Sequence, residues 1–246
     1  MPLVIVLTIF GAAFLSHIAP FPFLLEAFRP ARSIWHVPQP PGEKNVYLTF
    51  DDGPNAFWTP RVLDALRDEG VTATFFLIDE HITPETEWVV QRIAAEGHGL
   101  ALHSGSRKPV VMSERALAAA LTRNAQRIAA VAGRPPCRMF RPHAGWRSST
   151  MYEALAMMDY KLAGWSWGMW DWNWWKKPTG AAVSERLARK ASPGDVIVIH
   201  DGHHKDPRRD RSHAGAAVRL LVPALRQRGY TFAPLCDGRE GTASMR

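Results

Sequence analysis

The feature that most constrains this chain is a sustained alternation of short apolar runs with helical patterns. Strands that alternate with helices along a whole domain are parallel strands joined by right-handed crossovers. We expect strands at 46–50, 73–78, 99–103, 137–141, 161–165, 195–200 and 230–234. We expect helices at 60–69, 84–96, 113–131, 148–158, 182–191 and 215–228. Thr59 should cap the first helix and Ser113 should open the third.

This alternation allows either a closed or nearly closed barrel or an open doubly wound sheet. A glycine-rich phosphate loop does not follow the first strand, which disfavours a dinucleotide-binding fold. A chain of 246 residues suits a single barrel, which typically has roughly 250. We therefore predict an α/β fold, a distorted (β/α)7-8 barrel of parallel strands with outer helices.

The chain divides into an apolar N-terminal segment, a proline-rich linker and the barrel, at residues 1–28, 29–44 and 45–246. Residues 1–25 hold no Asp, Glu, Lys or Arg. A membrane anchor, a signal peptide and a buried helix all stay open, because the clean apolar run is shorter than the about 20 residues that span a bilayer and no basic residue precedes it. We expect membrane association or export to the cell envelope. Arg29 and Arg32 favour a cytoplasmic flank, which leaves a cytoplasmic location open.

The net charge of +7 favours anionic partners or simply improves solubility. The sequence has no zinc-finger motif and no aromatic RNA-binding strand, so we expect no nucleic-acid partner. Two cysteines, Cys137 and Cys236, exclude a disulfide-dense scaffold and a four-cysteine zinc site. Whether they form one bridge, and hence the redox compartment, stays open.

Reactive side chains stand where several expected strands end. They are Asp51 and Asp52, His103, Arg141, Asp171, and His200 with Asp201. Each alone is typical of a turn or a structural hydrogen bond, but strand ends of a parallel barrel meet at one face. Carboxylate and imidazole groups can hold a divalent metal that polarises a carbonyl and activates water, with a carboxylate as base and a second histidine as acid. The pattern predicts metal-assisted hydrolysis of an amide or ester.

The run Thr49-Phe50-Asp51-Asp52-Gly53-Pro54 resembles the first motif of the polysaccharide deacetylases, carbohydrate esterase family four. The order of later motifs fits the same family over residues 46–234. The resemblance implies a distorted (β/α) barrel, a divalent metal that is commonly zinc, and removal of N- or O-acetyl groups from chitin, peptidoglycan and related sugars.

Carried over by position, the resemblance also implies residue roles. The catalytic residues would be Asp51 as base, Arg141 in contact with that base, His200 as general acid, and Asp171 retained from the fourth motif. The metal ligands would be Asp52 and His103.

Three positions depart from the family pattern. Arg107 stands where the family has a third metal-binding histidine, His143 where it has proline, and Gly168 where it has an aspartate that tunes the catalytic histidine. A guanidinium cannot ligate a metal, and at about 4 Å from a dication its repulsion is on the order of 8 kcal/mol at an effective dielectric of 20. We hypothesise that Arg107 turns away and that His143 supplies the missing imidazole. The alternatives are a site without metal, and a His143 that only lines the pocket.

Four further residues are expected to bind substrate. The backbone N–H of Ala144 would hold the oxyanion, and exposed indoles of Trp146 and Trp172 would carry sugar rings. Arg208, in a basic loop after His200, would clamp a phosphate or carboxylate of a lipid-linked or cell-wall glycan. The alternatives are buried packing for most of the tryptophans and a solvated mobile loop around Arg208.

The sequence therefore predicts a metal-dependent hydrolase that removes acetyl groups from N-acetylated or O-acetylated sugars of a glycan. The rival is a non-catalytic carbohydrate-binding protein on a degraded enzyme scaffold. Arg107 and Gly168 favour the rival. The retained residues at 51, 52, 103, 141 and 200 favour the enzyme.

Overall fold

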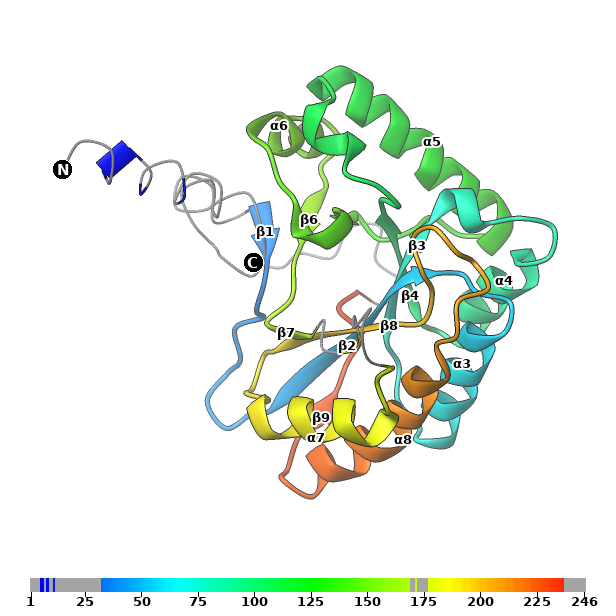
Figure 1. Ribbon diagram of the computed structural model, residues 1–246, viewed down its shortest axis with the longest axis vertical. Helices are drawn as coiled ribbons and strands as arrows, with labels where there is room; N and C mark the ends of the chain where they lie inside the picture. Colours follow the sequence, from blue (N-terminus) through cyan, green and yellow to red (C-terminus); the bar gives the residue numbers. More distant parts are fainter. Residues whose placement is uncertain are drawn as a thin grey trace.

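The structure, a computed structural model, describes Ile5, Val6, Thr8, Gly11 and residues 32–168, 171 and 177–236. Parallel strands fill its middle and helices cover their outer side (Figure 1). The strands are β1 (Ser33–Ile34), β2 (Asn45–Gly53), β3 (Thr74–Ile78), β4 (Gly99–His103), β5 (Met139–Arg141), β6 (Lys161–Ala163), β7 (Trp167–Gly168), β8 (Val196–His200) and β9 (Thr231–Phe232). The α-helices are α3 (Trp58–Asp68), α4 (Glu87–Ala95), α5 (Glu114–Ala132), α6 (Ser149–Met157), α7 (Gly180–Lys190) and α8 (Ser212–Arg226). Short 3₁₀ turns are η2 (Asp79–His81), η3 (Lys108–Val111) and η4 (His143–Gly145).

The sheet runs in the order β1-β6-β5-β4-β3-β2-β8-β7, with β9 added beside β2. Each pair of neighbouring strands along this path is parallel. The helices follow the same circuit, because α7 packs on α8, α8 on α3, and α3 through α6 pack in succession. The expected distorted barrel is confirmed, and it stays open between β1 and β7 within the part of the chain that is described.

Strand alternation sorts side chains between two apolar layers. In β3, Phe75 and Leu77 join the large core under the helices, whereas Phe76 joins the smaller core inside the barrel. In β8, Ile197 faces the helices and Val198 faces the interior in the same way. Because successive side chains of a strand point to opposite faces, every second position of each strand lines the interior.

The sequence predicts the N-cap of α5 correctly and that of α3 wrongly. Ser113 caps α5 as expected, its hydroxyl accepting from the backbone N–H of Ala116. The prediction for Thr59 is wrong, because α3 begins at Trp58 and the Asn55 side chain accepts from the backbone N–H groups of Phe57 and Trp58. Thr59 lies inside the first turn of α3, so its hydroxyl can form a hydrogen bond outside the helix.

The segment expected as a linker contributes to the sheet. β1 pairs with β6, and the backbone N–H of Val37 donates to Gly194 O. Residues 1–28, expected as a separate apolar segment, lie largely outside the described residues. Among the residues described, no helix combines the length and apolar character needed to cross a bilayer.

The two cysteines form a disulfide bond, Cys137–Cys236. It joins the segment before β5 to the segment after β9, across a sequence separation of 99 residues. The backbone N–H groups of Leu235 and Cys236 donate to the Thr74 hydroxyl, so hydrogen bonds reinforce the same attachment. Residues 233–236, which follow β9, are thereby fixed to the sheet.

Candidate functional site

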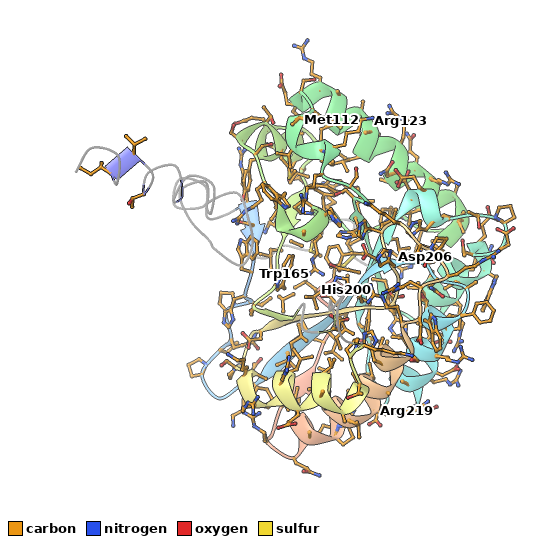
Figure 2. The ribbon with its side chains drawn as sticks, viewed as in Figure 1. Met112, Arg123, Trp165, His200, Asp206 and Arg219 are labelled. Carbon is orange, nitrogen blue, oxygen red and sulfur yellow. A yellow bond between two sulfur atoms is a disulfide. The ribbon has the colours of Figure 1, made fainter. Side chains whose placement is uncertain are left out.

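The interior positions at the ends of four strands converge on one pocket. Asp51 pairs in register with His200, and His103 with Arg141. Figure 2 shows His200 and Trp165 in the middle of the molecule, with Arg219 far out on a peripheral helix. The pocket is lined by Asp51, Asp52, His103, Arg107, His143, Ala144, Trp165, Val198, His200 and His204. Residues far apart in the sequence thus share one site, as expected from a parallel barrel.

Asp51 is held by a fully buried arginine. Nη1 of Arg141 lies 2.5 Å from Asp51 Oδ1 and donates a second hydrogen bond to the Thr49 hydroxyl at 2.9 Å. Nη2 donates to Gly164 O at 2.7 Å, and the guanidinium lies 3.8 Å from the ring centre of Phe76. These contacts fix the orientation of the Asp51 carboxylate at the pocket.

A β-bulge turns two consecutive aspartates toward the same pocket. The pairing of β2 with β3 shifts register between Asp51 and Gly53, and Asp52 adopts a left-handed backbone with φ of 70°. Without the extra residue, alternation would point Asp52 toward the helices. Gly53 is required here, because a Cβ at that position would lie 2.8 Å from a carboxylate oxygen of Asp201.

Asp52, His103 and His143 form a group with metal-binding chemistry. Each offers one ligand atom, and these atoms lie within 4.8 Å of one another. Burial lowers the pKa of His143 to about 4, helped by the neighbouring His103 and His204, so its ring is neutral near pH 7. Burial by itself raises the pKa of Asp52, but the adjacent histidines outweigh this effect and hold it below its ordinary range. Two imidazoles and a carboxylate are a ligand set that zinc accepts.

Hydrogen bonding indicates that a cation fits this group. Nδ1 of His103 lies 2.7 Å from Arg141 O, which only accepts, so Nδ1 carries the proton. Nε2 lies 3.2 Å from Asp52 Oδ1, and the Asp51 and Asp52 carboxylates outweigh burial and raise the pKa of His103. That oxygen is buried and has no hydrogen-bond partner among the described residues. A carboxylate oxygen and an imidazole nitrogen this close are stabilised by a positive charge between them, either a proton or a bound metal ion.

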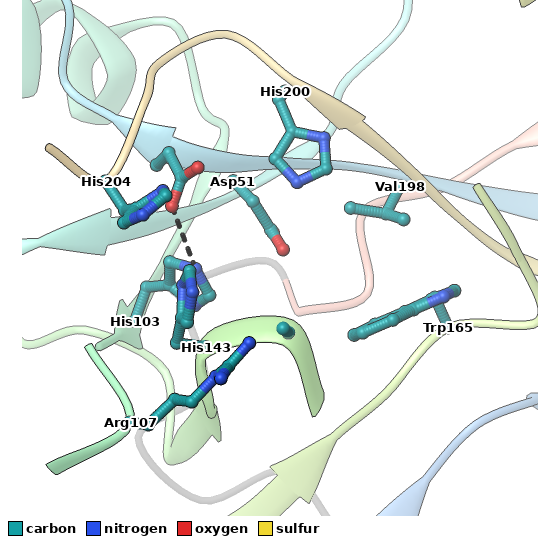
Figure 3. Close-up of a pocket in the computed structure, with 10 residues that line it drawn as sticks. Asp51, His103, Arg107, His143, Trp165, Val198, His200 and His204 are labelled. Atoms are coloured by element: carbon teal, nitrogen blue, oxygen red, sulfur yellow. Dashed lines mark ion pairs between the residues drawn. The ribbon is translucent and has the colours of Figure 1, made fainter. Parts of the chain in front are cut away.

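Arg107, which we expect to turn away from a bound metal, stays on the pocket wall. It lines the wall beside His143, and its guanidinium lies 5.0 Å from the ring centre of Trp146 (Figure 3). A guanidinium has no lone pair to offer a metal, so Arg107 is not a ligand. The indole therefore supports the guanidinium at a position where it borders the pocket without belonging to the ligand group.

His200 is oriented by Asp171. Nδ1 of His200 lies 3.0 Å from Asp171 Oδ1, and its backbone N–H donates to Oδ2 at 2.5 Å. Burial lowers the pKa of His200, but the Asp171 carboxylate outweighs burial and raises it overall. The carboxylate partner of this histidine is thus Asp171 and not position 168, where a Cβ would overlap with Val198.

The remaining residues that the sequence predicts to bind substrate do not all line the pocket. Ala144 lines the pocket with a left-handed backbone, φ 50°, and Trp146 lies under Arg107 without being a lining residue. Trp172 lies outside the described residues. Arg208 is exposed and is not among the lining residues.

Several functional neighbours were missed by reasoning from the sequence. His204 and Val198 line the pocket, and the rings of His204 and His143 lie 4.4 Å apart. His213 adds a second imidazole to Asp171, with Nε2 3.3 Å from Oδ2. The pair His203-His204 just after a strand end was a usable signal for His204, whereas His213 sits in a helix with no local signal.

Asp201, noted in the sequence only as part of a strand end, is a buried carboxyl beside the bulge. It accepts a hydrogen bond from the Thr59 hydroxyl. Burial, together with the nearby charges of Asp51 and Asp52, raises its pKa to about 7. This contact explains why Thr59 is used inside α3 and not as its cap.

Comparison with known proteins places this geometry in context. The family model described as polysaccharide deacetylase matches residues 38–163. A chitooligosaccharide deacetylase from Bradyrhizobium sp. is 32% identical over 202 residues, covering 79% of this chain and 90% of the relative. A crystal structure of a peptidoglycan N-acetylglucosamine deacetylase, in complex with 4-naphthalen-1-yl-N-oxidanyl-benzamide, is similar with a TM-score of 0.73 and 25% identity, covering 87% of this chain and 95% of that one. A mutant of a carbohydrate esterase family 4 pseudoenzyme with restored activity has a TM-score of 0.70 at 22% identity, covering 82% and 69%, and shows the fold alone.

The arrangement of His200 makes one prediction about its ionisation. Asp171→Asn should lower the pKa of His200 by about one unit or more, because the amide removes the charge that favours the imidazolium. NMR titration of the ring measures this shift. Asp64→Asn, which removes a carboxylate on the surface of α3, serves as the control and should leave the His200 pKa in place. An unchanged His200 pKa in Asp171→Asn would contradict the pairing.

Proposed function

Because the chain belongs to the polysaccharide deacetylase family, we propose that it hydrolyses the acetamide of N-acetylated sugars in a glycan. O-acetylated sugars are the related alternative. The observation that carries the proposal is the convergence of three units on one pocket: Asp51 with its arginine, the Asp52 ligand group, and His200 with its carboxylate. These supply a base, a metal site and an acid, the parts that metal-assisted amide hydrolysis needs.

We assign the metal site to Asp52, His103 and His143, with zinc as the cation that suits two imidazoles and one carboxylate. A cation bound there would polarise the acetamide carbonyl and lower the pKa of a neighbouring water. His143 replaces the histidine for which the chain has Arg107. The buried Asp52 Oδ1, which faces His103 Nε2 at 3.2 Å, supports this assignment.

We assign the proton transfers to Asp51 and His200. Asp51, oriented by Arg141, would accept a proton from the attacking water while a C–O bond forms at the acetamide carbon. We assign the backbone N–H of Ala144 to the developing oxyanion. His200 would donate a proton to the nitrogen as the C–N bond breaks, giving acetate and a free amine. Asp171 stabilises the imidazolium that precedes this step.

An apolar wall of the pocket suits the acetyl methyl group. Trp165 and Val198 are both buried and lie across the pocket from His103 and His204 (Figure 3). A methyl group set against these side chains would leave water, which favours an acetyl over a more polar substituent. This wall supports an acetylated substrate class.

Acetate release tests the proposed activity directly. Purified protein loaded with zinc should release acetate from N-acetylglucosamine oligomers, and a chelator should abolish the release. Asp51→Asn should reduce kcat by about 10²- to 10⁴-fold, the usual contribution of a general base. Asp64→Asn on the outer face of α3 is the matched control and should retain activity. A fully active Asp51→Asn variant would show that the base is wrongly assigned.

A second candidate is a non-catalytic carbohydrate-binding protein on the same scaffold. Arg107 at the position of a family metal ligand favours it. This candidate requires the wild type to bind N-acetylated oligomers without releasing acetate, which the same assay combined with calorimetry distinguishes from the enzyme.

Metal binding tests the assignment of His143. His143→Ala should weaken Zn²⁺ binding by more than the roughly 10- to 100-fold that is typical of losing an outer partner of a ligand. Competition with a chelating dye gives the affinity. His36→Ala, at a half-exposed histidine paired with Asp195, is the control. Undiminished Zn²⁺ affinity in His143→Ala, or no Zn²⁺ binding by the wild type, would refute the assignment.

We further propose that the protein works in the cell envelope. The Cys137–Cys236 bond supports an oxidising compartment, and the apolar residues 1–25 would anchor the chain at a membrane or direct its export. A wall-bound or lipid-linked glycan would then be within reach. Protein isolated from its native host should carry no free thiol, and reduction should lower its stability by about 2–4 kcal/mol. Two free thiols in the isolated protein would contradict this location.

A further inference from the structure

Arg107 is a permanent positive charge on the wall of the proposed catalytic pocket. It lines the pocket and is solvent-exposed. No carboxylate among the described residues lies within ion-pair distance of it. Arg141, in contrast, is fully buried and paired with Asp51. Arg107 therefore offers its charge to the pocket and not to a partner within the described protein.

Trp146 gives the Arg107 side chain a defined position. The guanidinium lies 5.0 Å from the centre of the indole ring, a distance typical of a cation–π contact. The Arg107 backbone is also fixed, because Arg107 is the N-cap of η3 and its carbonyl accepts from the backbone N–H of Val110. A stacked guanidinium keeps its N–H donors at the edge of its plane, where they can meet a carboxylate or phosphate bidentately. Such preorganisation reduces the entropy lost when a ligand binds.

The carboxylates in the pocket do not neutralise the positive charge of Arg107, because each has another partner. Asp51 is engaged by Arg141, and Asp52 belongs to the ligand group. The neighbours of Arg107 on the same side are the imidazoles of His143 and His204, which carry no negative charge (Figure 3). The pocket thus has one apolar wall, at Trp165, and one wall with an unbalanced positive charge.

We propose that Arg107 binds an anionic group of the substrate, so that the enzyme prefers acidic N-acetylated glycans. The group would be a carboxylate or phosphate within reach of the acetamide that is hydrolysed. This inference rests on the proposed deacetylase function and adds the substrate class to it. Arg107, inside the pocket lining, takes the part that the sequence suggested for the exposed Arg208.

Matched substrates test the preference. An N-acetylated oligosaccharide with a free carboxylate is compared with the same compound converted to a carboxamide, and a phosphate monoester is compared with its neutral parent. We expect kcat/KM to favour the anionic member of at least one pair by about tenfold, the size of one charge-assisted hydrogen bond. The pair that shows the preference identifies carboxylate or phosphate as the recognised group.

Substitutions then assign the preference to Arg107. Arg107→Gln should collapse the ratio of anionic to neutral kcat/KM toward one, mainly through a higher KM for the anionic substrate. Arg107→Lys should restore part of the ratio. Lys108→Gln removes the same charge from the neighbouring exposed residue, which does not line the pocket, and should keep the ratio.

The outcomes separate the two proposals. Equal kcat/KM for both members of both pairs, or a ratio that survives in Arg107→Gln, overturns the role of Arg107 while leaving the deacetylase function intact. If none of the substrates yields acetate, the proposed deacetylase function is wrong. In that case calorimetry still tests Arg107, because tighter binding of the anionic oligosaccharide by the wild type than by Arg107→Gln supports it and equal affinity refutes it.

Discussion

The buried ion pair between Arg141 and Asp51 is the interaction on which the site depends. A fully buried guanidinium is tolerated only when its donors are satisfied, and here they reach Asp51, the Thr49 hydroxyl and the carbonyls of Ala163 and Gly164. One side chain on β5 thereby ties together β2, β6 and the segment that follows β6. Removing either charge would leave the other uncompensated, which costs about 3–5 kcal/mol. The same contacts fix the carboxylate proposed as base.

The polar residues of the pocket come from two kinds of element, strands and the connections between them. The strands supply Asp51, His103 and His200 through alternation and parallel register, whereas the loops supply His143 and Arg107. The strand residues are buried and held by hydrogen bonds, so their geometry is rigid. The proposed base and acid thus lie on strands, whereas one proposed metal ligand and the proposed anion-binding arginine lie on turns between strands.

Much of the fold could be predicted because its elements are strongly patterned. The strand at 99–103 was predicted with the bounds that the structure has, and the helix opened by Ser113 ends within one residue of its expected end. Thr59 was wrongly predicted as the N-cap because a threonine before a proline is typical of that position. In the structure its hydroxyl donates instead to Asp201, which is distant in the sequence. The contact of Arg107 with Trp146 could not be predicted, because the indole lies 39 positions further along the chain, beyond the reach of local patterns.

The sequence by itself determined the parallel barrel and the strand ends that carry reactive side chains, because hydrophobic alternation and turn residues act over short stretches of chain. Only the tertiary structure decided that Asp52 turns inward through a bulge, that His143 joins Asp52 and His103, and that Cys137 pairs with Cys236. These outcomes depend on distances between segments that are remote in sequence, and such distances are set by packing and register. Local propensity carries no information about them.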